Sequence, residues 1–314
     1  MNPKIGIVTV LFKSETVLAD FFSSLKIQTY QNFVLYIVDN KSPDNSLNIA
    51  KQLAGKNSFQ TFIIENDDNY GVAKGNNIGI RRALENECDM ILLSNNDITL
   101  TPTSIEALLN GIEAKKASLA VPKIYFYGTN QIWLAGGRFL KFNGWTEHTG
   151  FHKEDKGQYD QCKCITYAPT CFMLIRKEVF SKIGFMDDVY FVYWDDTDFV
   201  YRAIKQNLTL WYVPQSIVNH KESTSTGAGV MSDFSLYYQY RNLIYFSLKN
   251  YSGLFALYVI MFNISTHLFK RIFTFPYPKW KLGIKAYKEG FKLFFSSRIS
   301  QKLYNQSNIN ITNY

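Results

Sequence analysis

The chain has 314 residues, 46% of them hydrophobic and 16% aromatic, and its 34 basic and 26 acidic residues give a net charge of +8. This composition supplies a large buried core and excludes an intrinsically disordered chain or a low-complexity scaffold. The basic surplus lies in the C-terminal part. Residues 241–314 hold 11 basic residues and one acid, Glu289, whereas residues 1–240 have a net charge of −2. We therefore expect the two parts to perform different tasks.

The N-terminus and the cysteines indicate a cytoplasmic protein. The opening MNPKIGIVTVLF has a short apolar run and no small-residue cleavage site, so we expect no signal peptide. Cys88, Cys162, Cys164 and Cys171 form no CxxC pair, and the four histidines show no zinc-ligand spacing beside them. This pattern argues against a structural zinc site and favours reduced thiols.

Apolar runs and amphipathic stretches alternate over the first 125 residues. We predict strands at residues 4–11, 33–38, 60–65, 89–93 and 119–121, and helices at 15–26, 46–54, 72–84 and 103–114. A continuous Val- and Ile-rich run such as Lys4–Leu11 is typical of a strand buried in a parallel sheet. The alternation predicts an α/β fold with an open, mostly parallel sheet and helices on both faces.

The pattern changes after this region. Residues 124–187 are irregular, with only short apolar runs, and a helix at Phe199–Ile204 and a strand at Leu210–Val218 follow them. The segment Ser223–Gly229, STSTGAG, is predicted to be a flexible linker. We therefore expect one domain over residues 1–228 and a basic, aromatic helical region over residues 229–314.

Polar clusters follow the predicted strands, where ligands bind in open α/β sheets. Asp39 could bind a nucleotide base or ribose, or it could simply belong to a turn. Asp97, flanked by Asn95 and Asn96, suits a divalent cation that shares substrate phosphates. An Asx turn before the next helix explains it at least as well. The first strand lacks a following GxGxxG and the chain lacks GxxxxGK[ST], which argues against dinucleotide-binding and P-loop proteins.

A second polar cluster contains three carboxylates within four positions. Asp195, Asp196 and Asp198 crowd one another, and crowding raises a carboxyl pKa toward that of a general base. Acidic residues in the first turn of a helix are the alternative. Trp194 offers a flat apolar face for a sugar ring. His220 could be a metal or phosphate ligand, although a surface histidine is the simpler interpretation.

Four motifs in order resemble glycosyltransferase family 2 over roughly residues 4–250. They are VDNKSPDNS, ENDDNYGVAKGNNIGI, LLSNNDITL and LIRKEVFSKIGFMDDVYFVYWDDTDFVYR. The resemblance is greatest to the bacterial rhamnosyltransferase-like branch that builds cell-surface polysaccharides. It implies a GT-A fold, a nucleotide-sugar donor, a divalent cation (Mn²⁺ or Mg²⁺) and inversion at the anomeric carbon.

The same resemblance implies roles for the donor-side residues. Asp39 would contact the nucleotide base, and Gly71 and Lys74 would lie near the ribose and diphosphate. Asn96 and Asp97 match the DxD-type motif, with Asp97 as metal ligand and an amide in place of the first acid.

On the acceptor side, the resemblance implies that Asp196 is the catalytic base, with Asp195 in the place where the family usually has Glu. His220 would help to hold the metal or the diphosphate. Gly136 and Gly137 could let a sugar approach the backbone, although a tight turn explains them equally well.

The basic tail interleaves cations with Phe, Tyr and Trp, which suits helices lying on an anionic membrane surface. Packing on the catalytic domain or a homo-oligomer is the second interpretation, and nucleic-acid binding is the weakest. The apolar run Leu254–Ile264 is too short to span a bilayer.

Together, these patterns predict an inverting hexosyltransferase, peripheral on the cytoplasmic face of the membrane, that acts on a lipid-linked or oligosaccharide acceptor. A metal-dependent nucleotidyltransferase and a non-catalytic basic scaffold are the alternatives.

Overall fold

The computed structural model describes residues 2–221, 232–273 and 277–311, so the predicted linker Ser223–Gly229 lies outside the described residues. The chain divides into two compact units. The first comprises Met1–Leu140 and Thr146–Ala228, and the second, which we call the helical unit, comprises Lys141–Trp145 and Gly229–Tyr314.

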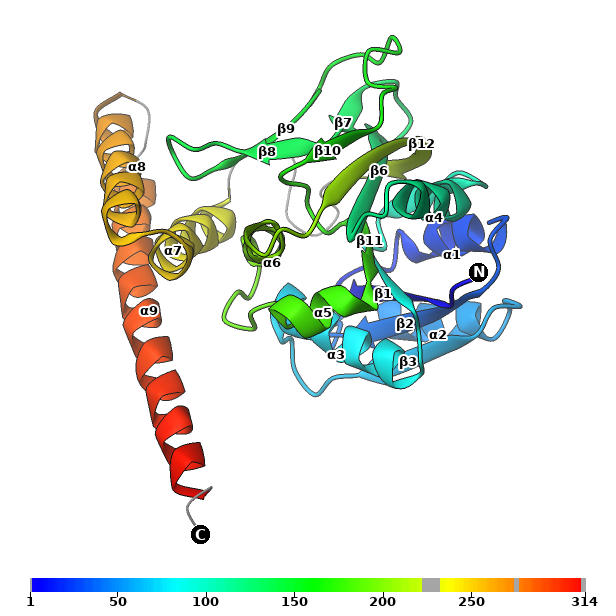
Figure 1. The fold of residues 1–314 in the computed structure, drawn as a ribbon, viewed down its shortest axis with the longest axis horizontal. Helices are drawn as coiled ribbons and strands as arrows, with labels where there is room; N and C mark the ends of the chain where they lie inside the picture. Colours follow the sequence, from blue (N-terminus) through cyan, green and yellow to red (C-terminus); the bar gives the residue numbers. More distant parts are fainter. Residues whose placement is uncertain (1, 222–231, 274–276, 312–314) are drawn as a thin grey trace. The chain divides into compact units, whose positions relative to one another are not determined.

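The first half of the sheet is parallel, as predicted. Strands β1 (Ile5–Leu11), β2 (Phe33–Asp39), β3 (Thr61–Glu65) and β4 (Met90–Ser94) lie in the order β3-β2-β1-β4. Every residue of β2 is buried, which explains why this strand shows no apolar–polar alternation. Figure 1 shows these strands with the helices α1 (Leu18–Lys26), α2 (Ser46–Ala54) and α3 (Gly71–Glu85) that connect them.

Helix α3 packs directly on β1, because a Cβ atom at Gly79 would lie only 2.5 Å from Cγ1 of Val8. Such close packing leaves no room for a side chain at this position. It fixes the N-terminal end of α3 beside the carboxyl ends of β1 and β2, where the predicted ligand site lies.

The second half of the sheet is mixed. Antiparallel β11 (Phe172–Arg176) lies between β4 and β6 (Leu119–Phe126), and β6 pairs in parallel with β12 (Leu210–His220). Shorter strands complete this half: β5 (Ile98–Leu100), β7 (Ile132–Leu134) and β10 (Lys163–Ile165) join the sheet, whereas β8 (Gly137–Phe139) and β9 (Thr146–His148) form a separate hairpin. The remaining helices of this unit are α4 (Ser104–Ala114), α5 (Lys177–Ile183) and α6 (Asp195–Lys205).

The region expected to be irregular, residues 124–187, therefore contains five complete strands, four of them only three residues long. The strand expected at residues 119–121 also continues to Phe126. The β12–β6 register shifts after Val213, whose partner is Pro122. Because proline cannot donate to a sheet ladder, a shift at this point is its ordinary consequence.

A buried ion pair anchors the loop that follows β9. Nζ of Lys123, on β6, lies 2.7 Å from Oδ2 of Asp155 and also bonds Asp160, while Tyr125 donates to the same Asp155 carboxylate. Lys123 and Asp155 are both almost fully buried. Burial raises the pKa of Asp155. The hydrogen bonds from Lys123, Tyr125 and the amide of Gly157 lower it by more than burial raises it, so the pKa lies below its ordinary value.

The helical unit contains α7 (Asp233–Asn250), α8 (Gly253–Phe273) and α9 (Tyr277–Ile311), coloured yellow to red in Figure 1. Its centre is aromatic: the rings of Tyr240 and Tyr287 stack at 5.0 Å, and the buried His267 lies edge-on to both. Across the described parts of the chain, every helix is too short or too polar to cross a bilayer.

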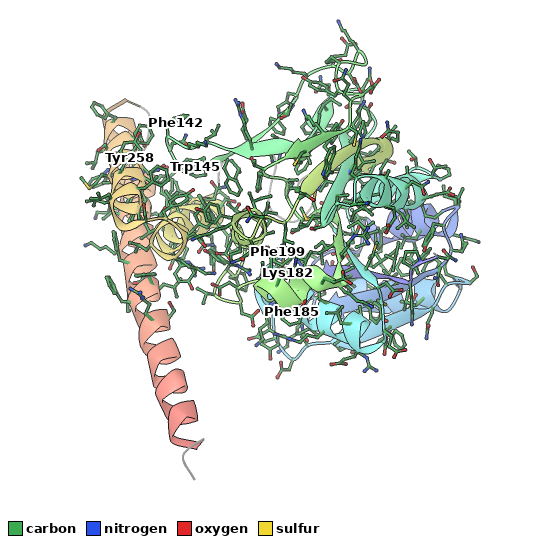
Figure 2. All side chains as sticks on the ribbon, in the orientation of Figure 1. Phe142, Trp145, Lys182, Phe185, Phe199 and Tyr258 are labelled. Atoms are coloured by element: carbon green, nitrogen blue, oxygen red, sulfur yellow. The ribbon has the colours of Figure 1, made fainter. Side chains whose placement is uncertain are left out.

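The tip of the β8–β9 hairpin belongs to the helical unit. Nε1 of Trp145 donates to Oδ1 of Asn263 at 2.7 Å, and Nδ2 of Asn263 donates to the carbonyl oxygen of Asn143 at 2.9 Å. Phe142 lies edge-on to Phe262 of α8, with ring centroids 6.2 Å apart. Figure 2 labels Phe142 and Trp145 at this tip.

Candidate active site

The end of β2 is tied to the start of α3 by side-chain amides. Asn40 donates to the carbonyl oxygen of Gly71 at 3.0 Å and accepts a hydrogen bond from Asn66 at 2.8 Å. The buried carboxylate of Asp39 accepts from the backbone N–H of Ser42, with oxygen distances of 3.2 and 3.4 Å. Asp39 thus belongs to a turn, as the alternative interpretation of this residue held. It also lies at the edge of the sheet where ligands bind in α/β folds.

Gly71 begins α3 with a φ of +78°. Any Cβ at this position would overlap the carbonyl oxygen of Phe191, which accepts a 2.7 Å hydrogen bond from the N–H of Val72. The absence of a side chain at Gly71 therefore lets the start of α3 pack against Phe191, in the segment that leads into α6. One turn into the helix, Nζ of Lys74 lies 3.5 Å from the ring centroid of Tyr70, a cation–π distance.

The Asn95–Asp97 cluster adjoins His220. Asn96 donates to the carbonyl oxygen of Val10 at 2.7 Å, which fixes it to the end of β1. Oδ1 of Asp97 lies 3.3 Å from Nε2 of His220. His220, on β12, is the strand partner of Ile98 on the antiparallel β5, the residue that follows Asp97. Within the described residues, both Asp97 Oδ1 and His220 Nδ1 are buried without a hydrogen-bond partner.

These two side chains fit a divalent cation. Two ligand atoms that lie about 2.1 Å from one cation are about 3 Å apart when they subtend a right angle at it, which matches the 3.3 Å between Asp97 and His220. No cluster of three or more His, Cys, Asp or Glu suited to a metal exists among the described residues. A cation held here would thus take its other ligands from water or from a substrate diphosphate, as Mg²⁺ commonly does.

The Asp195–Asp196 pair begins α6, where Asp195 is buried and Asp196 is half-buried. Tyr167 donates to Oδ2 of Asp196 at 3.0 Å, and the N–H of Thr197 donates to Oδ1 at 2.6 Å. Burial raises the pKa of Asp196, and burial together with the charge of Asp196 raises the pKa of Asp195 to about 8. Two such carboxyl groups share protons, so one can remain neutral while the other is ionised.

The third acid of the cluster has a structural partner. Oδ2 of the buried Asp198 lies 2.8 Å from Nε of Arg202, which also donates to the carbonyl oxygen of Phe185 at 2.8 Å. This i,i+4 pair fastens α6 to the chain that follows α5. The acids therefore occupy the first turn of a helix, as one interpretation held, and only two of them remain for chemistry.

The three residues predicted to contact a sugar have structural tasks. Trp194 is only 6% exposed and precedes α6 with a φ of +68°, so its indole has little face to offer a sugar in this conformation. A Cβ at Gly136 would meet the side chain of Ile165, and one at Gly137 would overlap the backbone of Glu147. The space that a side chain would occupy at both glycines is thus filled by protein, which agrees with the alternative interpretation of a tight turn.

Sequence reasoning missed an aromatic cluster behind the site. The ring of Trp133 lies edge-on to His220, with centroids 4.5 Å apart, and 4.8 Å from His148. The ring of His148 stacks on Tyr167 at 6.1 Å. Burial lowers the pKa of His148 to about 4. The sequence offered no signal for these residues, because β7, β9 and the loop after β10 are too short to show a periodicity.

Cys171 lies near both the Asp97–His220 pair and the Asp195–Asp196 pair. Burial raises its pKa, and the charges of Asp97 and Asp196 raise it further, which indicates that both carboxylates lie in the neighbourhood of this thiol. The fold thus brings together the predicted metal pair and the predicted base from segments about 100 residues apart.

Comparison with known proteins identifies the family of this chain. Residues 6–184 match the family described as glycosyl transferase family 2, which covers more than half of the chain. The chain belongs to glycosyltransferase family 2. The family assignment establishes a glycosyltransferase and decides against the nucleotidyltransferase and the non-catalytic scaffold.

Relatives in this family act in glycan synthesis. The chain is 23% identical over 246 residues to a low-salt glycan biosynthesis hexosyltransferase, Agl10, of Haloferax volcanii, covering 77% of this chain and 75% of that one. It is 25% identical to the dTDP-rhamnosyl transferase RfbF of Shigella flexneri, and the match covers 80% of this chain and 82% of that one. It is 22% identical to the N-acetylglucosaminyl-diphospho-decaprenol L-rhamnosyltransferase of Mycobacterium tuberculosis, with 76% and 83% covered.

Solved structures show the same GT-A fold. The structure of residues 1–349 of TarS from S. aureus matches with a TM-score of 0.60 at 12% identity, covering 93% of this chain and 81% of that one. GalNAc-T7 in complex with UDP, GalNAc and Mn²⁺ matches with a TM-score of 0.58 at 14% identity, and the match covers 76% of this chain and 48% of that one. The predicted α/β fold is therefore confirmed as GT-A.

Proposed function

We propose that this protein is an inverting glycosyltransferase that moves rhamnose or another hexose from a nucleotide-diphosphate donor to a lipid-linked or growing surface polysaccharide. The observation that carries the proposal is the Asp195–Asp196 pair at the start of α6, in which Asp195 is buried and Tyr167 holds the carboxylate of Asp196. The names of the rhamnosyltransferase relatives support the choice of sugar and of a lipid-diphosphate acceptor.

In this mechanism Asp196 is the general base. An acceptor hydroxyl attacks the anomeric carbon from the side opposite the nucleotide, and its proton passes to Asp196 as the new C–O bond forms. The bond between the anomeric carbon and the donor phosphate oxygen breaks, and the nucleoside diphosphate leaves. Tyr167 and Thr197 fix the two oxygens of Asp196, which orients the carboxylate before the acceptor arrives.

Asp195 is assigned a different task. Burial and the charge of Asp196 raise its pKa, so we assign the proton that the pair retains to Asp195 and the negative charge to Asp196. Asp195 positions the base and is not itself the proton acceptor.

The donor would lie along the carboxyl ends of the strands, with Asp39 near the base, Gly71 and Asn96 near the ribose and diphosphate, and Lys74 beside the phosphates. Asp97 and His220 would hold Mn²⁺ or Mg²⁺. When bound, the cation would neutralise charge that develops on the leaving diphosphate. Lys74, on the first turn of α3, would add a second positive charge there.

The helical unit is proposed to hold the enzyme at an anionic membrane, at its cytoplasmic face. Helix α8 carries no charged residue from Gly253 to Phe269, and large apolar side chains on it are exposed: Leu254, Leu257, Tyr258, Met261, Leu268 and Phe269. Helix α9 carries exposed lysines at helical spacing: Lys281, Lys285, Lys288 and Lys292. An apolar helix face combined with a cationic one is typical of helices that lie in a membrane interface.

A panel of nucleotide sugars tests the proposed activity. Purified protein with Mn²⁺ or Mg²⁺ is expected to release a nucleoside diphosphate from one of them, faster when a short-chain N-acetylglucosaminyl-diphospho-lipid is present. Asp196→Asn should abolish transfer while nucleotide-sugar affinity, measured by calorimetry, stays within about twofold. Full turnover by this variant would remove Asp196 from the role of base.

A further inference from the structure

The first unit contains an open cavity of about 870 Å³ beside the β8–β9 hairpin. Trp133, Arg138, Glu147, His148, Phe151 and Tyr159 are among its lining residues. The volume is within the range of pockets that enclose small organic ligands. None of the site residues predicted from the sequence lines it.

Two walls of the cavity adjoin the reacting groups. Trp133 contacts His220 with a centroid distance of 4.5 Å, so the metal side of the site lies directly behind this wall. His148 stacks on Tyr167, whose hydroxyl is 3.0 Å from Asp196. One side chain, Trp133, therefore separates the cavity from the proposed metal pair, and two, His148 and Tyr167, separate it from the proposed base.

The loop that forms the outer wall is held in place. Gly150 has a φ of +81°, and a Cβ there would lie 2.9 Å from the ring of Tyr159. The carbonyl oxygen of Tyr159 accepts a 2.9 Å hydrogen bond from Tyr212, and the buried Lys123–Asp155 pair anchors the middle of the loop. The cavity is thus formed before any ligand binds, which reduces the entropy cost of binding.

The chemistry of the lining suits a neutral sugar. Aromatic rings provide apolar faces for the C–H groups of a pyranose. Arg138 and Glu147 pair at 2.7 Å and are exposed, so their charges cancel while their donors and acceptors remain available to hydroxyl groups. Lys153 adds one positive charge to the lining and three further donors for hydroxyl groups. Nε1 of Trp133 is buried without a hydrogen-bond partner among the described residues.

We infer that this cavity binds a sugar of the acceptor saccharide through its uncharged pyranose ring, at a site that His148 and Tyr167 separate from Asp196. The inference rests on the proposed function, and it assigns acceptor recognition to Arg138, Phe151 and Tyr159. These residues take the place of Trp194, Gly136 and Gly137, which the fold covers.

Three variants of the full chain test the assignment. Phe151→Ala and Arg138→Ala remove lining side chains that are 41% and 68% exposed, so neither should disturb folding. Lys156→Ala, on the same loop but outside the lining, is the matched control. We expect the KM for the N-acetylglucosaminyl-diphospho-lipid to rise at least fivefold in the two lining variants. The donor KM and the slow hydrolysis of donor without acceptor should stay within twofold of wild type.

Binding of simple probes gives an independent readout. Saturation-transfer NMR with methyl pyranosides should show contacts from sugar protons that weaken in Phe151→Ala, whereas inorganic diphosphate should not compete. An unchanged acceptor KM, a raised donor KM, or competition by diphosphate would each overturn the assignment. A wild-type protein that turns over no nucleotide sugar would instead refute the proposed function, while the pyranoside contacts would still test the cavity.

Discussion

The hydroxyl of Tyr167 donates a 3.0 Å hydrogen bond to Oδ2 of Asp196, although the two residues are 29 positions apart in the chain. Burial, reinforced by the charge of Asp196, raises the pKa of Tyr167 well above its ordinary value, so the phenol keeps its proton and remains a donor. A hydrogen bond to an ionised group is worth about 1.5–3 kcal/mol.

Tyr167→Phe is therefore expected to lower kcat about tenfold or more, because Asp196, the proposed base, loses a partner that orients it. The donor KM should change less than twofold. Tyr36→Phe is the matched control, since it removes another buried hydroxyl, bonded to Asn86 at the far end of α3. Equal kcat values for the two variants would contradict a positioning role for Tyr167.

Asp195→Asn should stabilise the protein without donor at alkaline pH. The folded-state pKa of Asp195 is raised to about 8, above its unfolded value, so the stability of the wild type falls as pH rises from about 4 toward 8. The amide carries no such penalty. We expect the Tm of the variant to exceed that of wild type by at least about 2 °C at pH 8.5, and the difference to shrink at pH 5. A difference that does not vary with pH would contradict this prediction.

Removing the metal should stop transfer. Chelation with EDTA is expected to abolish activity, and Mn²⁺ or Mg²⁺ should restore it. His220→Gln should raise the Mn²⁺ concentration for half-maximal activity about tenfold or more, because one of the two protein ligands is weakened. His152→Gln, which alters an exposed histidine, is the control. Full activity in EDTA would exclude the metal role of Asp97 and His220.

Breaking the buried ion pair should destabilise the first unit. Lys123→Met leaves Asp155 buried without its cation, which typically costs about 3 kcal/mol. The lowered pKa of Asp155 contributes stability that is present above its unfolded pKa and is lost as pH falls through the folded value. Urea unfolding at pH 7 and pH 3.5 should show a large loss in the variant at pH 7 and a smaller one at pH 3.5.

Vesicle binding tests the exposed face of α8. Met261→Asp should reduce co-sedimentation with vesicles that contain anionic lipid, because it places a negative charge in the apolar face. Ile27→Asp is the matched control in the first unit, since Met261 is 53% and Ile27 54% exposed. Equal binding by both variants, or equal binding of wild type to neutral and anionic vesicles, would contradict the proposed membrane surface.

The sequence predicted the parallel half of the fold well, for a physical reason. Lys4–Leu11 and Phe33–Val38 are long, continuous apolar runs because β1 and β2 are buried on both faces, and the structure has these strands within one residue of the predicted limits. The helix expected from Glu15 begins only at Leu18, as helix ends commonly shift.

The second half was less predictable because its strands are short. A three-residue strand such as β8 cannot show a period of two, and β11 was visible only as part of the apolar run Ala168–Ile175. Asp196 could be found in the chain because it stands in a motif. Its partner Tyr167 could not, since nothing local in the sequence distinguishes it from the other 20 tyrosines.

The hairpin tip has a consequence for any attempt to divide this enzyme. Residues Lys141–Trp145 join the helical unit while the strands on either side of them belong to the first unit. The chain therefore crosses between the units three times: before Lys141, after Trp145 and before Gly229. Deletion of residues 229–314 would remove Asn263, the hydrogen-bond partner of Trp145, from a hairpin whose strands border the proposed acceptor cavity. Truncation would thus change the proposed membrane attachment and the proposed acceptor binding together, so point substitutions are needed to test each one separately.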